Sequence, residues 1–327
     1  MRARAVVPIV VALACVLPFV ASDYRLFQLT MVLVYAIALL GLNILTGFNG
    51  QISLGHGAFY AIGAYAAAIA MEHAGVPYWA TIPLAGLVCG VAGFLFGVPA
   101  LRLEGLYLAL ATFALGLALP QLLKYKHFEA WTGGVQGIVI VKPDAPLGLP
   151  LNADQWLYYF TLAIAVVGFV IAHNLLRGRI GRAIVAIRDH PIAAQAMGID
   201  TARFKSLTFG VSAAFTGVAG ALGAIAVQFV APDSFGFFLS IIFLVGSVVG
   251  GVASIQGALW GALFIQFVPN LADRISKAAP WALYGLAMIA FVYLMPSGVA
   301  GGIALLRAKL AAPRRNRAEA QLRRRST

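Results

Sequence analysis

Residues 177–205 read RGRIGRAIVAIRDHPIAAQAMGIDTARFK and form the most charged stretch before the C-terminal tail. Six of these residues are basic, namely Arg177, Arg179, Arg182, Arg188, Arg203 and Lys205. A basic residue at the centre of a bilayer costs about 2.5–3.5 kcal/mol, whereas an Ile or Val returns only about 0.5 kcal/mol. This segment, called the basic loop below, therefore lies outside the membrane between apolar segments that can cross it.

The basic loop keeps the periodicity of helices. Ile180, Ile184 and Ile187 recur at i, i+4 and i+7, which predicts an apolar stripe beside an arginine-rich face. Pro191 suits the first position of a second helix, and Gly198 suits the left-handed residue beyond its end. The candidate cap residues between the two helices are Asp189 and His190.

The second predicted helix covers residues 191–197, about two turns at 3.6 residues per turn. We expect its exposed face to present Ala193, Ala194 and Met197, which are two small side chains and one adaptable side chain. A short, capped helix of this kind is suited to insertion into a groove of another protein. An ordinary basic cytoplasmic loop is the simpler alternative.

The composition places most of the chain in a membrane. The 327 residues are 61% hydrophobic and only 10% charged, and the mean hydropathy is +0.91. A soluble domain has about 25% charged residues, so an ordinary soluble protein is excluded. The 35 glycines indicate closely packed transmembrane helices. The predicted fold class is an all-α polytopic membrane protein.

Charge and cysteine content exclude two further kinds of protein. Cys15 and Cys89 lie in separate apolar segments, so they give neither a disulfide framework nor a metal motif. A net charge of +12 would suit a nucleic-acid binder in a soluble protein, but here the basic residues flank membrane segments. Membrane orientation explains them better, and no nucleic-acid partner is predicted.

Apolar segments of membrane-spanning character predict about ten transmembrane helices. They cover residues 5–21, 26–45, 52–71, 79–98, 106–123, 156–176, 206–230, 238–252, 255–268 and 281–305. The first could equally begin a secretory signal peptide, but Phe19 occupies a position where cleavage needs a small residue, which favours a retained helix. Segments 238–252 and 255–268 are short and flank Gly250 and Gly251, so we expect a hairpin of broken or partly re-entrant helices.

Basic residues set the expected orientation. With the amino terminus in the cytoplasm, ten spans place both the basic loop and the tail, residues 308–327, on the cytoplasmic side. That arrangement puts 17 of the 23 Lys and Arg residues inside, as the positive-inside rule requires. The membrane domain is then residues 1–307, and the longest external loop, residues 125–155, reads as a structured cap. The tail reads as a solvated basic arm near anionic lipid.

A second informative stretch sets polar residues among glycines at membrane depth. Residues 41–65 read GLNILTGFNGQISLGHGAFYAIGAY. Buried polar groups are costly there, and amides can serve neighbouring helices or a passing solute. The candidate residues for a solute path are Asn43, Asn49, Gln51, Ser53 and His56. The alternative is a packing interface between helices in which these groups are satisfied.

This stretch resembles the signature of branched-chain amino-acid permeases of bacterial ABC importers. The signature positions are filled by Gly41, Leu42, Asn43, Gly47, Gly50, Gln51, Ser53, Gly55, His56, Phe59, Gly63, Ala64 and Tyr65. Residues 132–138, the basic loop and residues 245–261 fit the same family. The resemblance covers about residues 33–295 and leaves out the tail.

The basic loop also resembles the Glu-Ala-Ala-x-x-x-Gly loop of ABC importer permeases, in which a coupling helix docks on the ATPase. Ala193, Ala194 and Gly198 match it, whereas Ile192 stands where the pattern has Glu. The candidate ATPase-coupling residues are Arg188, Asp189, Ala193, Ala194, Met197 and Gly198.

The family resemblance implies a set of partners and a location. Such importers combine two permease subunits, usually different homologues, with two ATP-binding cassette ATPases and a periplasmic binding protein. The expected location is the bacterial inner membrane, with several passes and both termini in the cytoplasm. The expected solute is a branched-chain or similar neutral amino acid, while urea and short amides stay open as alternatives.

Other activities fit the sequence less well. Residues 210–213 could suggest an intramembrane serine protease, but the five histidines end at His190, so later spans offer no base. The chain has no Gly-Lys pair and hence no Walker A loop, and its histidines show no metal spacing. An ion-coupled secondary transporter or channel would ordinarily place a charged residue within a span. All eleven acidic residues fall in predicted loops or at span ends, which favours energy supplied by a partner. We expect neither an enzyme nor a resident cofactor or metal.

Overall fold

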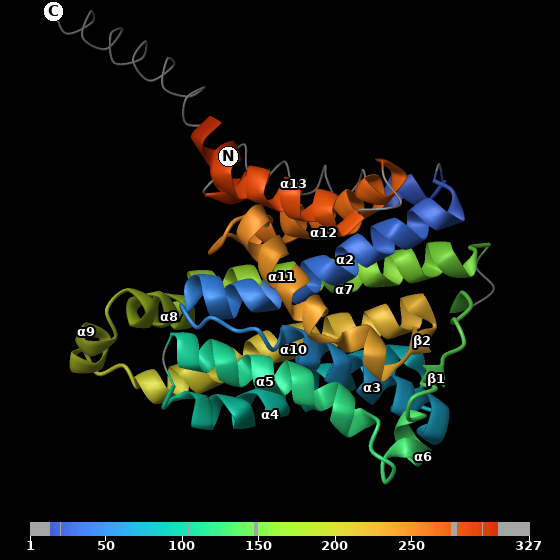
Figure 1. Ribbon diagram of the computed structural model, residues 1–327, viewed down its shortest axis with the longest axis horizontal. Coiled ribbons are helices and arrows are strands. Elements are labelled where there is room, and N and C mark those ends of the chain that lie inside the picture. Colours follow the sequence, from blue (N-terminus) through green and yellow to red (C-terminus); the bar gives the residue numbers. More distant parts are fainter. Residues whose placement is uncertain are drawn as a thin grey trace, which may run out of the picture.

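The protein is a bundle of long helices, shown by a computed structural model that describes residues 14–19, 21–103, 105–146, 150–275, 280–295 and 297–306 (Figure 1). The helices and strands are η1 (Leu17–Phe19), α2 (Asp23–Leu42), η2 (Asn43–Phe48), α3 (His56–Ala74), α4 (Tyr78–Ala100), α5 (Leu106–Leu123), α6 (Glu129–Thr132), β1 (Ile138–Val139), α7 (Ala153–Arg177), α8 (Arg179–Asp189), α9 (Pro191–Ala196), α10 (Thr201–Val227), β2 (Phe229–Val230), η4 (Pro232–Phe235), α11 (Phe237–Gly250), α12 (Ile255–Ile275) and α13 (Pro280–Leu294). Residues 298–306 are also helical.

Seven stretches among the described residues are long and apolar enough to cross a membrane. They are Asp23–Phe48, Tyr78–Ala100, Leu106–Leu123, Ala153–Arg177, Thr201–Val227, Pro232–Gly250 and Ile255–Asp273. The chain is therefore an all-α polytopic membrane protein. The total of about ten stays a prediction, because α3 and α13 are not among the seven and the predicted first segment lies largely outside the described residues. The basic tail, residues 308–327, lies outside them as well.

Two predicted segments differ most from the helices observed. The segment predicted over residues 281–305 is interrupted, since α13 ends at Leu294 and the next helix contains Gly298 at φ +70°. The segment predicted over residues 255–268 is too short, because α12 continues to Ile275. A segment predicted from its apolar residues ends where polar residues such as Asp273 begin to appear. The helix itself continues through them, because its backbone hydrogen bonds do not depend on apolar side chains.

A tight turn separates α11 from α12, in agreement with the predicted hairpin. Gly251 has φ +118° and Ala253 has φ +59°, so the chain reverses within residues 251–254. A positive φ is easy for glycine but unusual for alanine. We call this turn, residues 251–254, the second break, because another interruption precedes it in the chain.

Helix α10 lies at the centre of the bundle, between α2, α3 and α4 (Figure 1). Small residues let the backbones approach closely. A Cβ added to Gly220 would lie 2.0 Å from the carbonyl oxygen of Tyr60, and one added to Gly217 would lie 2.4 Å from the Sγ of Cys89. The many glycines of the sequence therefore serve helix contacts here.

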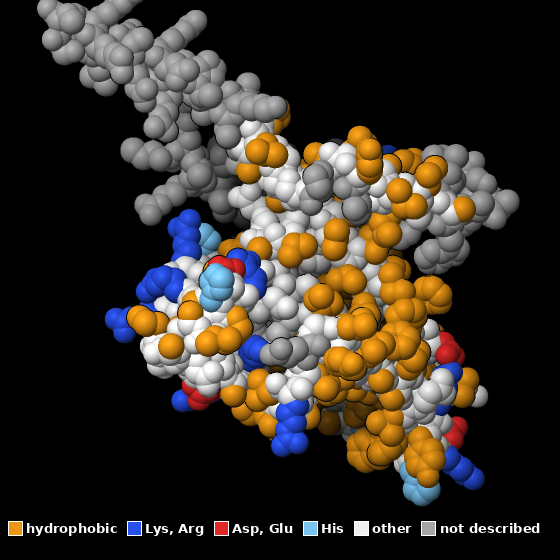
Figure 2. All heavy atoms as spheres, turned by 60° about the vertical axis from the view of Figure 1, so that its left-hand side comes forward, with side chains coloured by type: hydrophobic (Ala, Val, Ile, Leu, Met, Phe, Trp, Pro, Cys, Tyr) orange, Lys and Arg blue, Asp and Glu red, His pale blue; other side chains and the backbone are white. Residues whose placement is uncertain are grey.

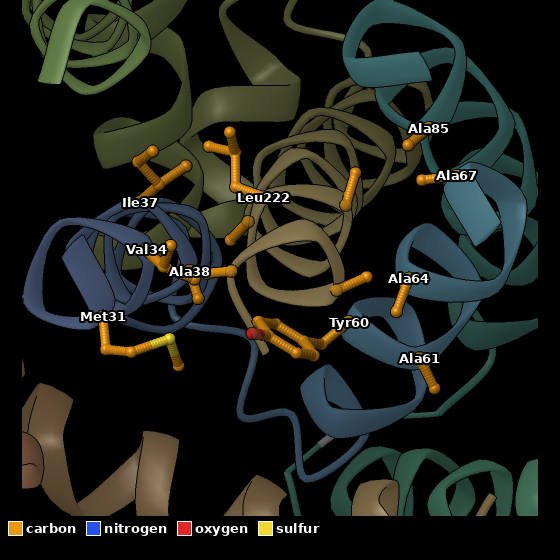
Figure 3. Close-up of a cluster of buried hydrophobic side chains, with 14 of the residues drawn as sticks. Met31, Val34, Ile37, Ala38, Tyr60, Ala61, Ala64, Ala67, Ala85 and Leu222 are labelled. Carbon is orange, nitrogen blue, oxygen red and sulfur yellow. The ribbon is translucent and has the colours of Figure 1, made fainter. Parts of the chain in front are cut away.

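Larger side chains fill the space beside these contacts. Figure 3 shows Val34, Ile37 and Ala38 of α2 lying close to Leu222 of α10, with Tyr60 of α3 reaching toward the two helices. These side chains belong to one buried cluster that spans several helices. Together, small and large residues bury α2 and α10 much more completely than α4, α5 and α7.

The two predicted loops lie at opposite ends of the helices (Figure 1). Helices α8 and α9 of the basic loop project from one end. At the other end β1 pairs antiparallel with β2, with Ile138 opposite Val230. Lys124 and Asp233 form an ion pair of 2.5 Å beside this small sheet. Residues 125–146 are thus structured at the end of the bundle opposite the basic loop.

Charge is distributed unevenly between the ends. Figure 2 shows Lys and Arg side chains gathered around the end that carries α8 and α9, next to a broad hydrophobic surface over the helix bodies. The exposed basic residues of this end include Arg177, Arg179, Arg182, Arg188 and Arg203. A hydrophobic belt beside a basic end is the distribution that a bilayer favours.

The position of the loops predicts how the chain crosses the membrane. Gln136 and Gln195 are both exposed and lie at opposite ends. With Cys15 replaced by Ser, Gln136→Cys and Gln195→Cys should react with an impermeant maleimide from opposite sides of the membrane. Labelling of both positions from one side would contradict the arrangement, and the Cys15→Ser parent corrects for reaction at the buried Cys89.

Candidate functional site

The polar stretch predicted from the sequence forms an interruption between two buried helices. Helix α2 passes into η2, a π-helix of six residues, and residues 49–55 are not helical before α3 starts at His56. Gly50 has φ +75° within this interruption. π-Helical turns are rare and often occur at functional sites. We call residues 43–55 the first break.

Asn43 joins the first break to the second break. Its Nδ2 donates to the carbonyl oxygens of Gly251 at 3.2 Å and Ser254 at 2.9 Å, and its Oδ1 accepts from the Ala253 amide at 2.7 Å. A Cβ added to Gly47 would lie 2.1 Å from Asn43 Oδ1 and 2.4 Å from the Ala253 nitrogen. The two breaks therefore touch, and one buried amide satisfies three backbone groups.

His56 lies in a chain of hydrogen bonds that holds the start of α3. Its Nδ1 is 3.0 Å from Ser53 Oγ and its Nε2 is 2.7 Å from Ser212 Oγ. Ser212 donates its hydroxyl hydrogen to the Gly41 carbonyl at 2.7 Å, so it can only accept from the ring. The ring therefore donates from Nε2 to Ser212, and the Ser53 hydroxyl oxygen accepts from the Gly55 amide.

The other two candidate residues differ from each other in their contacts. Gln51 Nε2 donates to the Lys205 carbonyl at 3.3 Å, and Thr46 Oγ1 donates to the Gln51 carbonyl at 3.1 Å. Asn49 is only 3% exposed, yet neither its Oδ1 nor its Nδ2 has a hydrogen-bond partner among the described residues. A buried polar group without a partner costs about 1–3 kcal/mol. Asn49 is therefore the candidate residue whose side-chain amide has no hydrogen-bond partner among the described residues.

Arg188 links the basic loop to the first break. Its Nη1 donates to the Gly47 carbonyl at 2.9 Å, while Nε and Nη2 contact Asp189 Oδ1 at 2.9 Å. The Arg188 side chain also covers Gly50, since a Cβ added there would lie 2.8 Å from Arg188 Cγ. Arg188, one of the predicted coupling residues, therefore contacts the first break at two glycines, Gly47 and Gly50.

The predicted stripe of the basic loop is partly wrong. Ile184 and Ile187 are buried as expected, but Ile180 is exposed and Gly181 is buried in its place. Because α8 begins only at Arg179, its first turn is set by the preceding chain. A Cβ added to Gly181 would lie 2.0 Å from the Leu176 carbonyl oxygen, so this close approach selects the buried side.

The predicted start and end of the second helix are mostly confirmed, but the residues predicted for its exposed face are partly wrong. Gly198 has φ +84°, as expected beyond the helix end. Met197 is 83% exposed and Ala193 is exposed, but Ala194 is only 5% exposed, so it does not lie on the outer face. Ile192 is 84% exposed instead. Helix α9 packs against α8 and α10. Apart from the exposed Gln195 its residues are apolar, so its sequence does not distinguish the buried Ala194 from the exposed Ile192 and Ala193.

The cap between α8 and α9 involves backbone groups. His190 is the C-cap of α8 and the N-cap of α9, and its amide donates to the Ala186 carbonyl at 3.0 Å. Asp189 is the last residue of α8, and its side chain pairs with Arg188. Pro191 occupies the first position of α9, as predicted.

Sequence reasoning missed two partners of the candidate residues. Ser212 was weighed only as part of a protease motif, although it bonds to His56. The second break was noted as glycine-rich, but nothing in the sequence connected it with Asn43, about 210 residues earlier. Among the described residues, no group of three or more His, Cys, Asp or Glu side chains could hold a metal ion.

Comparison with known proteins places this architecture among transport proteins. The model of the family described as branched-chain amino acid transport system / permease component matches residues 24–295. The high-affinity branched-chain amino acid transport system permease protein LivM of Salmonella typhimurium is 34% identical over 86% of this chain and 71% of its own length. LivM of Escherichia coli is 33% identical over 88% of this chain and 72% of its own length.

A more distant relative covers most of its own length. The permease protein BraD of Pseudomonas aeruginosa, from the same kind of transport system, is 25% identical over 84% of this chain and 93% of its own length. No solved structure matches the chain.

The hydrogen bonds of His56 predict a large structural effect. His56→Ala should lower the free energy of unfolding by about 1–3 kcal/mol or more, because it removes the two buried hydrogen bonds that the ring makes with Ser53 and Ser212. Denaturant unfolding in detergent micelles measures the change. His127→Ala is the matched control, since His127 is exposed and stacks on Tyr125. Equal losses in the two variants would contradict the role of the His56 hydrogen bonds.

Proposed function

Because this chain belongs to the family of branched-chain amino acid transport permease components, we propose that it is the membrane-spanning subunit of an ABC importer for branched-chain amino acids. The match of the family model to residues 24–295, nearly the whole described helix bundle, carries this proposal. The identity to LivM proteins supports it independently. The permease is not itself the source of energy, which a separate ATPase supplies.

The proposed partners follow from the family. We infer ATP-binding cassette ATPases at the basic end, a second homologous permease beside this one, and a periplasmic binding protein at the end with β1 and β2. In this orientation both termini and the basic loop are cytoplasmic, which agrees with the gathering of basic side chains around α8 and α9 (Figure 2). The membrane is the bacterial inner membrane.

The proposed ATPase contact is the tip of the basic loop. Helix α9 projects from the bundle and presents Ile192 and Met197 to solvent. An exposed apolar pair on a short helix suits insertion into an apolar groove. Ala194 supports the helix from its buried side, whereas Arg188 and Asp189 connect it to the bundle.

The proposed solute path borders the first break. A neutral zwitterion needs hydrogen-bond partners for its polar end and an apolar wall for its side chain. Asn49 has an amide without an internal partner. Asn43, Gln51 and His56 hold the break in shape through bonds to other parts of the chain, and Ser53 bonds to His56. The path therefore uses the shape of the break together with a small number of weak polar contacts.

Uptake by reconstituted vesicles tests the function. Vesicles that contain this permease, its partner permease, the ATPase and the binding protein should accumulate radiolabelled leucine only when ATP is available to the ATPase. Unlabelled isoleucine and valine should compete, and urea or acetamide should not. Uptake of urea in place of leucine would assign the permease to the alternative solute, and ATP-independent uptake driven by an ion gradient would contradict an ABC importer.

Gly198 tests the coupling helix. Gly198→Val places a β-branched residue at φ +84°, which costs about 1 kcal/mol or more locally and should tilt α9. We expect ATPase association or ATP-driven uptake to fall at least several-fold while the permease still inserts. Co-purification of the ATPase and leucine uptake measure the effect.

Gly75 supplies the matched control for this change. It has φ +59° beyond the end of α3, at the opposite end of the bundle, and at both glycines an added Cβ meets no described atom within 4 Å. Gly75→Val thus introduces a similar backbone strain without touching α9, and it should leave ATPase association unchanged. Equal effects of the two variants would remove α9 from the ATPase contact.

A further inference from the structure

Three interruptions of membrane helices meet near the basic end of the bundle. The first and second breaks are joined by the three hydrogen bonds of Asn43. The third interruption follows Leu294, where α13 ends. It lies against the second break, because a Cβ added to Gly298 would be 2.5 Å from the Cα of Gly251. Parts of the chain that are about 250 residues apart therefore form one junction.

The junction contains several conformations that a relaxed helix bundle avoids. The first break, which forms part of the junction, begins with the π-helix η2. Ala253 adopts φ +59° without being a glycine. Asn49 is buried with an amide that has no partner among the described residues. Strained backbone and unpaired polar groups persist only where the surroundings enforce them, and they cluster where a protein changes conformation.

Two side chains enforce this arrangement from different directions. Asn43 holds the second break from within the membrane domain. Arg188 holds the first break from the basic loop, through its bond to the Gly47 carbonyl and its cover over Gly50. Arg188 also pairs with Asp189, directly before α9. A direct route from α9 to Gly47 therefore runs through the Arg188 guanidinium. The basic loop has a second contact with the first break, the bond from Gln51 to the Lys205 carbonyl.

We propose that Arg188 and Asn43 form a latch that closes the cytoplasmic end of the path. Arg188 is the positioning residue that transmits the position of α8 and α9 to the first break. Through its hydrogen bonds, Asn43 makes the second break move together with the first break, and the third interruption moves with the second break. Release of the latch separates the breaks and exposes Asn49. This inference rests on the proposed function for its direction of transport, but the latch itself is a property of the junction.

The buried Asn49 supplies a direct readout of the latch. In a Cys15→Ser background, Asn49→Cys should react slowly with a small thiol reagent, because the position is buried in the closed junction. Addition of the ATPase and ATP should raise the rate at least tenfold. Thr161→Cys is the control, since Thr161 of α7 is also buried and lies outside the junction. Its rate should stay slow in every condition.

Asn43 variants test the latch without any partner. Asn43→Asp keeps the shape and the acceptor but removes both donors to the second break. It should raise the Asn49→Cys labelling rate about tenfold in the absence of ATPase, and Asn43→Leu should do so at least as strongly. If Asn43→Leu fails to insert, Asn43→Asp still decides. Unchanged labelling in the variant that inserts would overturn the latch.

Arg188 variants test transmission from the basic loop. Arg188→Gln should keep ATPase association and ATP hydrolysis, yet lower leucine uptake per ATP at least tenfold and abolish the ATP-dependent rise in Asn49→Cys labelling. Arg188→Lys keeps the charge but cannot bridge Gly47 and Asp189 together, so it should resemble Arg188→Gln. Arg182→Gln is the matched control on the same helix, because Arg182 bonds only to the nearby Arg177 carbonyl among the described residues. It should change uptake per ATP by less than twofold.

The two proposals fail in distinguishable ways. If the wild-type complex moves a solute other than leucine while Asn49→Cys labelling follows ATP, the substrate assignment fails and the latch stands. If leucine uptake is normal but Arg188→Gln and Arg182→Gln behave alike, the latch fails and the importer assignment stands. A parallel loss of ATP hydrolysis and uptake in Arg188→Gln would place Arg188 in ATPase docking and would also overturn its role in the latch.

Discussion

An interrupted helix inside a bilayer must find hydrogen-bond partners in the protein, because lipid offers none. Asn43 meets this constraint here, since its single amide accepts from one backbone N–H and donates to two carbonyls of the second break. The turn between α11 and α12 can therefore lie between two membrane helices while the Gly251 and Ser254 carbonyls and the Ala253 amide all have hydrogen-bond partners. The position of the first break, and through it the start of α3, depends on the same contact.

Close packing around α10 makes this arrangement possible. Gly217 and Gly220 let α10 approach α3 and α4 until backbone atoms almost touch. With the helices at this distance, the His56 ring reaches both Ser53 and Ser212 directly. A bulkier α10 would hold α3 farther away and would open the chain of hydrogen bonds. Small residues and polar residues thus act together, the former by setting distance and the latter by fixing register.

The buried core of the permease is distinct from the junction that we propose to change conformation. Helices α2, α3 and α10 form a continuous buried core. The junction of the breaks lies at the edge of that core, next to the basic loop, and combines strained backbone with an unpaired amide. An ATPase that binds α9 would act on this junction through Arg188 with little deformation of the core. Such a division suits a subunit that must open at one end without losing its fold.

The sequence by itself determined the class of protein, the positions of most helices, the basic loop and its short capped helix, because hydrophobic length, charge and glycine placement are local properties of the chain. It also identified the polar stretch around Asn43 and His56, through a signature that local residues carry. Tertiary structure alone decided that Asn43 bonds to the second break, that Ser212 orders His56, and that Ala194 turns inward while Ile192 turns outward. These outcomes depend on which helices become neighbours, and side-chain partners about 150 to 210 residues apart leave no periodicity in the sequence that would reveal them.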